Sequence, residues 1–140
     1  MTREEFSKAL KDVRENSGLG RTKMRMMSRL PKQQIAYMEE ASNNYALKNV
    51  ICYLNTLNFQ LFLSIEQRCL VAQDNADVVS FFRGVRESKS ITQARLAELS
   101  KMATVSLQNI ERQQRKFHID AFLAIASALD IEIKICPIEK

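Results

Sequence analysis

The chain has 140 residues, of which 46% are hydrophobic, and its formal net charge is +5 at pH 7. This length is typical of one domain, and the apolar content excludes a chain that stays disordered. The basic excess is uneven, with +4 in residues 1–70 and +1 in residues 71–140, and it is compatible with a nucleic-acid partner without requiring one.

Three cysteines, Cys52, Cys69 and Cys136, lie far apart, so that neither a disulfide framework nor a zinc site is expected. The N-terminal residues are charged and no run of 18 apolar residues occurs, so we expect neither a signal peptide nor a membrane span. The sequence has no phosphate-binding glycine loop, no metal-ligand cluster and no nucleophile–base constellation. It therefore predicts a cytoplasmic protein that is not an enzyme and holds no metal or cofactor.

The apolar pattern of the chain repeats after 72 residues, because residues 6–63 align with residues 78–135 without a gap. Leu10 meets Phe82, for example. Six aligned pairs are identical: Val13/Val85, Arg14/Arg86, Glu15/Glu87, Ser28/Ser100, Glu39/Glu111 and Leu57/Leu129. Apolar positions that persist while most other residues change indicate two copies of one packed unit.

In the first half, this register predicts helices near residues 3–16, 21–28, 31–41 and 46–57 and a strand near residues 58–64. Pro31 suits the first turn of a helix, where its missing N–H is not needed. Met24, Met26 and Met27 are interpreted as core packing with one exposed methionine, rather than as a metal site. Residues 65–77 are interpreted as a linker, within which residues 65–72 are compatible with a continuation of the preceding strand or with a helical turn.

The second half has the clearer pattern. Its predicted elements are a helix through Val85, helices over residues 93–100 and 104–113, a helix from Asp120 and a strand over residues 131–135. Thr92 is expected to cap the second of these helices, which turns Leu96 and Leu99 inward. Residues 131–135 alternate strictly between apolar and polar, which is the pattern of a half-buried strand.

The segment Thr92–Arg115, TQARLAELSKMATVSLQNIERQQR, carries the most specific signal in the chain. Gln93 begins one helix, Leu96-Ala97 lies in its middle, a short turn follows, and a polar second helix ends near Glu111. This pattern resembles the helix-turn-helix of the lambda-repressor/Cro/XRE family, and the resemblance covers residues 78–130. The family often has glycine where this chain has Lys101, and a side chain there is costly if φ is positive.

The resemblance implies that the outer face of the second helix in this motif binds DNA. That face carries Thr104, Val105, Ser106, Gln108 and Asn109. Amide side chains can pair with adenine edges, hydroxyl groups can serve any base, and a valine can contact the methyl group of thymine. Gln93 has the position of the family residue that binds a backbone phosphate, and Arg112 and Arg115 are predicted to add phosphate contacts.

The repeat carries the same roles to the first half. The DNA-binding residues predicted there are Arg21, Lys32, Gln33, Gln34 and Tyr37, with Ala36 on the same outer face. Arg25 stands where the second half has Ala97, so its long side chain must extend outward from the helix crossing or reshape the helix pair. The first motif is therefore predicted either to bind DNA in a modified way or to serve as a structural partner.

We predict a mostly α fold of tandem lambda-repressor-like helix-turn-helix units, residues 1–64 and 78–140, each followed by one β-strand and joined by the linker 65–77. A lone strand needs a partner, so residues 58–64 are predicted to pair with residues 130–136 in a small antiparallel ribbon. Antitoxins of the HipB type, which partner HipA-type kinases, are similar, but they build such a ribbon between two chains. A homodimer with a swapped ribbon is the alternative.

The resemblance implies sequence-specific DNA binding by a transcriptional regulator, which we expect to be a repressor. Its partner would be double-stranded DNA, read by one chain as a pseudo-dimer. The alternative function is that of an antitoxin or another protein-interaction module that neutralises a toxin-like protein partner, with or without DNA binding.

Overall fold

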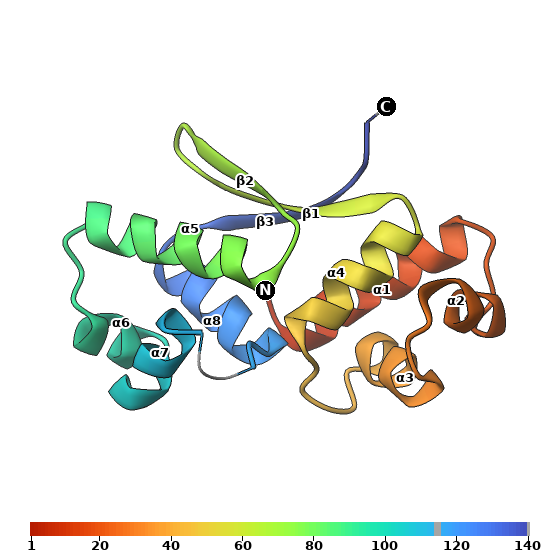
Figure 1. Ribbon diagram of the computed structural model, residues 1–140, viewed down its shortest axis with the longest axis horizontal. Helices are drawn as coiled ribbons and strands as arrows, with labels where there is room; N and C mark the ends of the chain where they lie inside the picture. The colour runs from red at the N-terminus through yellow and green to blue at the C-terminus, as the bar shows by residue number, and fades with distance from the viewer. Residues whose placement is uncertain (114–115, 140) are drawn as a thin grey trace.

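The computed structural model describes residues 1–113 and 116–139. In this part of the chain the elements are α1 (Arg3–Asn16), α2 (Arg21–Ser28), α3 (Lys32–Glu40), α4 (Leu47–Thr56), β1 (Phe59–Ile65), β2 (Arg68–Ala72), α5 (Asn75–Ser88), α6 (Gln93–Leu99), α7 (Thr104–Glu111), α8 (Ile119–Ala128) and β3 (Glu132–Pro137). Figure 1 shows two groups of helices, α1–α4 and α5–α8, under one small sheet. None of the described helices is both long and apolar enough to cross a membrane.

The three described strands form one antiparallel sheet in the order β2-β1-β3. β1 pairs with β3 from Phe59 opposite Pro137 to Ser64 opposite Glu132, which confirms the predicted pairing of the two strands. The prediction of a ribbon with only two strands is wrong, because β2 folds back on β1 as a hairpin inside the predicted linker. Beyond Ile65 the chain therefore neither extends β1 nor forms a helical turn.

The predicted helix starts agree with the structure to within one residue, and the starts of α3, α4 and α8 each differ by one. Pro31 has φ −59° and ψ 144° and precedes α3, so Lys32 and not Pro31 is the first helical residue. Thr92 caps α6 as predicted, since its side-chain oxygen accepts a hydrogen bond of 3.1 Å from the N–H of Arg95. A cap of this kind satisfies one of the backbone donors that a helix leaves free in its first turn.

The local backbone geometry repeats after 72 residues. Each of α1 to α4 begins 72 positions before the corresponding helix among α5 to α8. Left-handed φ angles recur at the same spacing: Gly18 (76°) and Ser90 (55°), Arg29 (63°) and Lys101 (58°), Ala41 (54°) and Gln113 (57°), Asn58 (61°) and Asp130 (61°). Because residues with side chains adopt such angles only where a turn requires them, the same turns connect the elements in both halves.

The contacts between the two halves are reciprocal. The N–H of Leu47 donates a 2.9 Å hydrogen bond to the carbonyl of Phe117, and the N–H of Ile119 donates one of 2.8 Å to the carbonyl of Tyr45. Ile119 corresponds to Leu47 across the repeat and Tyr45 corresponds to Phe117, so the two bonds are equivalent. The β1–β3 register is symmetric in the same way about Phe62 opposite Lys134. Reciprocal contacts of this kind are typical of a two-fold interface, and here they join two parts of one chain.

One continuous hydrophobic cluster extends through both halves. The rings of Phe82, Phe117 and Phe122 form its aromatic part, with centroids 5.6–6.1 Å apart. Neither half therefore has a core separate from that of the other half. This fits the small size of each half, because a chain of about 70 residues buries too little apolar surface for high stability by itself.

Two predictions about the core of α2 and α6 are wrong. Leu99 was expected to point inward but is 43% exposed, because Leu96, Ala97 and Ser100 form the buried side of α6 and Leu99 lies beside it. In α2, at the corresponding place, Met27 is exposed as well, and so is Met26. Two methionines of this run therefore lie at the surface instead of one, and only the third is buried.

The left-handed residue that ends α3 offers a test of the turn geometry. Ala41 has φ 54°, an angle that costs a residue with a Cβ more than it costs glycine. We expect Ala41→Gly to raise the free energy of unfolding by about 0.5–1 kcal/mol, after the greater entropy of glycine in the unfolded chain is included. The control is Ala9→Gly inside α1, which should lower it by about 1 kcal/mol. Urea unfolding of both variants is the measurement, and equal destabilisation by both would contradict the left-handed turn.

Candidate nucleic-acid interface

The outer face of α7 carries most of the side chains predicted to bind DNA. Thr104 and Val105 are exposed, and 60% of the surface of Val105 is open to solvent. Ser106, Gln108 and Asn109 are half-buried beside them. Leu107 and Ile110 on the opposite side are buried and attach the helix to the core. The helix therefore presents hydroxyl, amide and methyl groups together, which are the groups that can distinguish bases in the major groove.

The turn between α6 and α7 sets the angle at which α7 leaves the body of the protein. Lys101 lies in this turn with φ 58°, so the chain accepts a left-handed residue with a side chain where the resembled family often has glycine. The N–H of Met102 donates a 2.9 Å hydrogen bond to the carbonyl of Ala97, which closes the turn. Ala97 is only 1% exposed, so its small side chain lies within the packing of the helix pair, as predicted.

A partly buried ion pair fixes the C-terminal end of α7 to α5. The guanidinium group of Arg86 donates to both carboxylate oxygens of Glu111, at 2.8 and 2.9 Å, and to the carbonyl of Ile91 at 2.9 Å. The side-chain amide of Gln93 donates to the same carboxylate at 3.0 Å. Paired hydrogen bonds between planar groups hold both partners in one orientation, so this network fixes the position of α7.

The first half contains the same network at corresponding positions. Arg14 donates to both carboxylate oxygens of Glu39, at 2.6 and 2.8 Å, and to the carbonyl of Leu19 at 2.7 Å. Arg21 takes the place of Gln93 and donates to Glu39 at 3.1 Å. Tyr53 adds a further bond here, because its hydroxyl donates to Glu39 at 2.7 Å. Burial raises the pKa of Glu39, but hydrogen bonds from Arg14 and Tyr53 outweigh it and hold the pKa below its ordinary value.

The outer face of α3 differs in chemistry from that of α7. Lys32 and Gln33 are exposed, whereas Gln34 and Tyr37 are half-buried. The side-chain amide of Gln33 donates a 2.6 Å hydrogen bond to the hydroxyl of Tyr37, so these two groups stabilise each other on the surface. Arg25 is exposed where Ala97 is buried, and its side chain therefore extends outward from the helix crossing, one of the two outcomes predicted.

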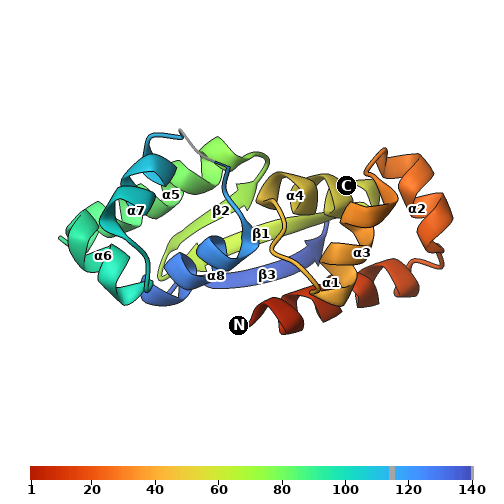
Figure 2. The ribbon, with the colours of Figure 1, turned by 90° about the horizontal axis from the view of Figure 1, so that it is seen from below.

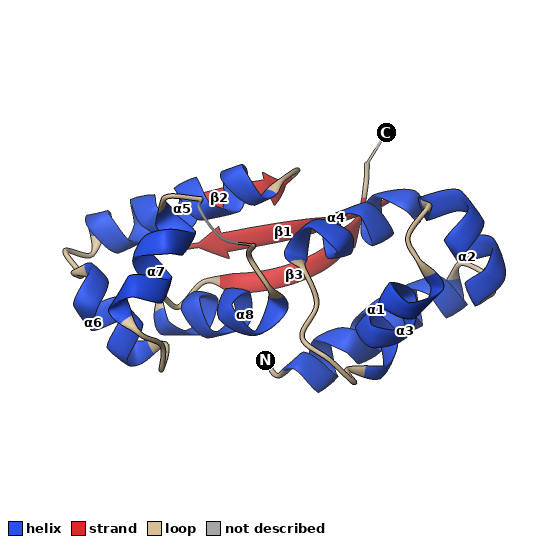
Figure 3. Cartoon of the chain, turned by 60° about the horizontal axis from the view of Figure 1, so that its bottom comes forward, coloured by secondary structure: helices blue, strands red, loops and turns tan. Residues whose placement is uncertain are grey.

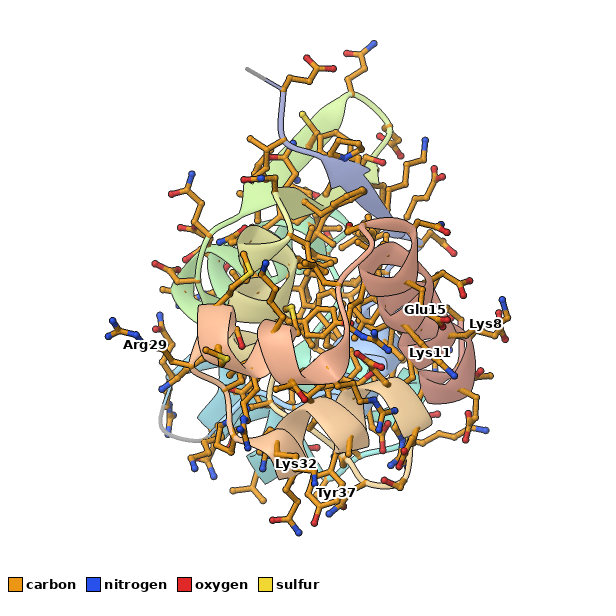
Figure 4. All side chains as sticks on the ribbon, turned by 90° about the vertical axis from the view of Figure 1, so that its right-hand side faces the viewer. Lys8, Lys11, Glu15, Arg29, Lys32 and Tyr37 are labelled. Carbon is orange, nitrogen blue, oxygen red and sulfur yellow. The ribbon has the colours of Figure 1, made fainter. Side chains whose placement is uncertain are left out.

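α3 and α7 lie on the same side of the molecule. In Figure 1 both helices are at the bottom, opposite the sheet, and Figure 3, with that side turned forward, shows α7 to the left of the strands and α3 to their lower right. Seen from below in Figure 2, they lie in the two separate halves, with β1 and β3 running behind them. Figure 4 shows Lys32 and Tyr37 projecting downward from α3, away from Lys8, Lys11 and Glu15 on α1.

The fold brings most of the predicted site residues to this one side, with differences in detail. Arg112 is exposed at the end of α7, and Arg115 lies outside the described residues. The side chains of Gln93 and Arg21 are partly engaged in the Arg–Glu networks, with Arg21 also donating to Glu40 at 3.0 Å. Sequence reasoning missed the structural pairs Arg14–Glu39 and Arg86–Glu111, although all four residues belong to the small set that is identical in both halves.

Comparison with known proteins finds one family model that matches part of the second half. Residues 83–135 match the family described as helix-turn-helix, of the XRE type, and the matched segment contains α6 and α7 with their turn. The family match supports a DNA-binding regulator of this type. No curated protein and no solved structure matches the chain.

Proposed function

We propose that this chain is a sequence-specific DNA-binding repressor in which two helix-turn-helix units of one chain act as a pseudo-dimer. The observation that carries the proposal is the position of α3 and α7, which lie on one side of a body whose halves meet through reciprocal contacts. Two-fold repressors bind successive major grooves in this way, with half-sites roughly 34 Å apart along the duplex.

The status of the first half as a second helix-turn-helix unit rests on the repetition of structure rather than on sequence identity. Its helices begin at corresponding residues, its turns use the same left-handed positions, and Arg14–Glu39 corresponds to Arg86–Glu111. These features concern packing, which is the constraint that both units share. The outer face of α3, in contrast, has kept few of the side chains found on α7.

The difference between the two outer faces determines the kind of DNA site that we propose. Residues 104–106 are threonine, valine and serine, whereas residues 32–34 are lysine and two glutamines. The lysine of the first unit favours phosphate groups or guanine. The hydroxyl groups and the valine of the second unit can contact the edges of other bases, so the two units read different bases. The preferred site therefore consists of two unlike half-sites.

The intramolecular pseudo-dimer can be tested by size and by dissection. We expect the full chain to be a monomer in light scattering, because β3 finds its partner strand within the same chain. Residues 72–140 alone should unfold or associate, since they lack β1 and its share of the common core. A well-folded monomer of residues 72–140 would contradict the shared sheet, and a full-length dimer would favour the swapped ribbon. DNA binding itself is tested by site selection with the full chain.

A further inference from the structure

A surface cavity of about 310 Å³ lies between α7 and α8, two helices that Figure 2 shows in the same half of the molecule. It is lined by both apolar and polar residues. The apolar residues are Met102, Ile110, Ala121 and Ala124, and the polar ones include Ser100, Lys101, Ser106 and Lys116. The volume is within the range of sites for small molecules.

The first half provides an internal reference, because larger side chains stand at corresponding positions there. Three small residues around the cavity are replaced across the repeat by larger ones: Gln34 stands for Ser106, Asn49 for Ala121 and Cys52 for Ala124. The amide of Asn49 lies 3.4 Å from the side-chain oxygen of Gln34, and the thiol of Cys52 lies 3.5 Å from the carbonyl of Ser28. The small side chains of the second copy thus leave open a cavity where the first copy has larger side chains.

A buried hydroxyl group at the cavity also differs between the copies. Ser28 occupies the position in the first half that corresponds to Ser100. The hydroxyl oxygen of Ser28 accepts a 3.1 Å hydrogen bond from the N–H of Leu30. Ser100 lines the cavity and is 7% exposed, yet its hydroxyl group has no hydrogen-bond partner among the residues that the structure describes. Buried hydroxyl groups are normally satisfied, so an unpartnered one at a cavity wall indicates room for a polar ligand.

The charges at the cavity favour an anion. Two ammonium groups, those of Lys101 and Lys116, line it, together with the imidazole of His118. The only carboxylate among the lining residues is that of Asp120, and it lies 3.1 Å from the guanidinium group of Arg3, which offsets its charge. The remaining positive charge matches a phosphate or carboxylate group of a ligand, while the apolar lining residues match a small hydrophobic group of the same ligand.

We propose that this cavity binds a small molecule that carries an oxyanion, of the phosphate monoester or carboxylate class, on a compact apolar group. Ser106 and Ile110 belong to α7, so a ligand in the cavity touches the helix that carries the predicted base contacts. Occupation of the cavity therefore changes how α7 meets DNA. This last step rests on the proposed function, whereas ligand binding itself does not.

The test uses the full chain without DNA and phenyl phosphate as the probe. Calorimetric titration of the wild type should show saturable binding. The double substitution Ala121→Asn with Ala124→Cys introduces the residues that already occupy these positions in the first half, and it should weaken binding at least tenfold. The matched control, Asn49→Ala with Cys52→Ala, changes the same positions of the first half but leaves Gln34 and all residues that line the cavity in place, so it should keep the wild-type affinity of the cavity. Circular dichroism melting checks that each variant is folded. Absence of saturation, or equal binding by the filled and wild-type chains, would overturn the proposal.

A second arm identifies the source of the anion, because a phosphate of the DNA backbone has the same chemistry. If a free small molecule is the ligand, the filled variant binds DNA like the wild type, and phenyl phosphate at constant ionic strength changes DNA affinity only in the wild type. If a backbone phosphate enters the cavity, phenyl phosphate competes with DNA and the filled variant binds DNA more weakly. The first result supports the small-molecule site, and the second would overturn it in favour of a contact with the DNA backbone. If the chain binds phenyl phosphate saturably but binds no DNA, the proposed function is contradicted and the anion site in the cavity is not.

Discussion

Replacement of Glu39 by glutamine is expected to lower the free energy of unfolding by about 3–5 kcal/mol. The carboxylate is buried and accepts two hydrogen bonds from Arg14 and one from the hydroxyl of Tyr53. Glutamine removes the negative charge but leaves the guanidinium group of Arg14, whose side chain is 9% exposed, without a counter-ion. Leaving one charge of a buried pair uncompensated is among the most destabilising changes that a single substitution can make.

Glu40→Gln is the matched control for this experiment. Glu40 also carries a carboxylate, but its side chain is exposed, and a carboxylate oxygen lies 3.0 Å from a guanidinium nitrogen of Arg21. An exposed pair of this kind contributes about 0–1 kcal/mol, so the control should unfold nearly as the wild type does. Urea unfolding at neutral pH gives both values. Equal effects of the two substitutions would mean that the Arg14–Glu39 pair does not hold α3 against α1.

The same pair predicts a pH dependence with a definite sign. Because the pKa of Glu39 in the folded protein lies below its ordinary value of 4.5, the folded state holds the proton less tightly than the unfolded chain does. The stability from Glu39 is therefore complete above pH 4.5 and is lost as the pH falls through the folded pKa. The difference in stability between the wild type and Glu39→Gln should shrink in that acidic range.

Replacement of Gln108 or Asn109 by alanine is expected to weaken specific DNA binding by about 1–3 kcal/mol each, which is roughly 5- to 150-fold. Both side chains lie on α7 beside the exposed Val105, and their amide groups can form paired hydrogen bonds with adenine. Binding to unrelated duplexes should change little, because contacts to phosphate groups supply that affinity. Fluorescence anisotropy with a selected duplex and a scrambled one measures both quantities at one salt concentration.

The controls for the amide substitutions are Asn55→Ala and Gln73→Ala. Asn55 lies near the end of α4 and Gln73 follows β2, and both are exposed outside α3 and α7. These variants remove the same chemical groups and should leave specific affinity unchanged. If Gln108→Ala and Asn109→Ala behave like the controls, the assignment of base contacts to this part of α7 is wrong.

The sequence allowed most of the helices to be predicted, because their apolar spacing repeats in two copies and each copy supports the other. The pairing of β1 with β3 followed from the need of a lone strand for a partner. β2 was not predicted, since Arg68–Ala72 is short and has no counterpart in the second half. The exposure of Leu99 was missed because an apolar residue on a short helix can lie beside the buried side as well as on it.

The candidate site was predictable to a smaller extent. The outer residues of α7 followed from the family resemblance, whereas the Arg–Glu networks require knowledge of which side chains meet across 25 residues of sequence. Identity in both copies was a signal for these pairs, but it does not by itself distinguish structure from function. The cavity between α7 and α8 depends on the combined effect of several small residues from different elements, which a pattern of apolar positions does not reveal.

The most direct test of the two-headed DNA-binding repressor is an unbiased selection of duplex DNA by the full chain at fixed salt concentration. We predict a site of two unlike half-sites about one helical turn, roughly 34 Å, apart, because α3 and α7 present different side chains on one side of the molecule. Gln108→Ala should relax the preference in only one of them. Recovery of a perfect palindrome, or of no preferred sequence, would contradict the account.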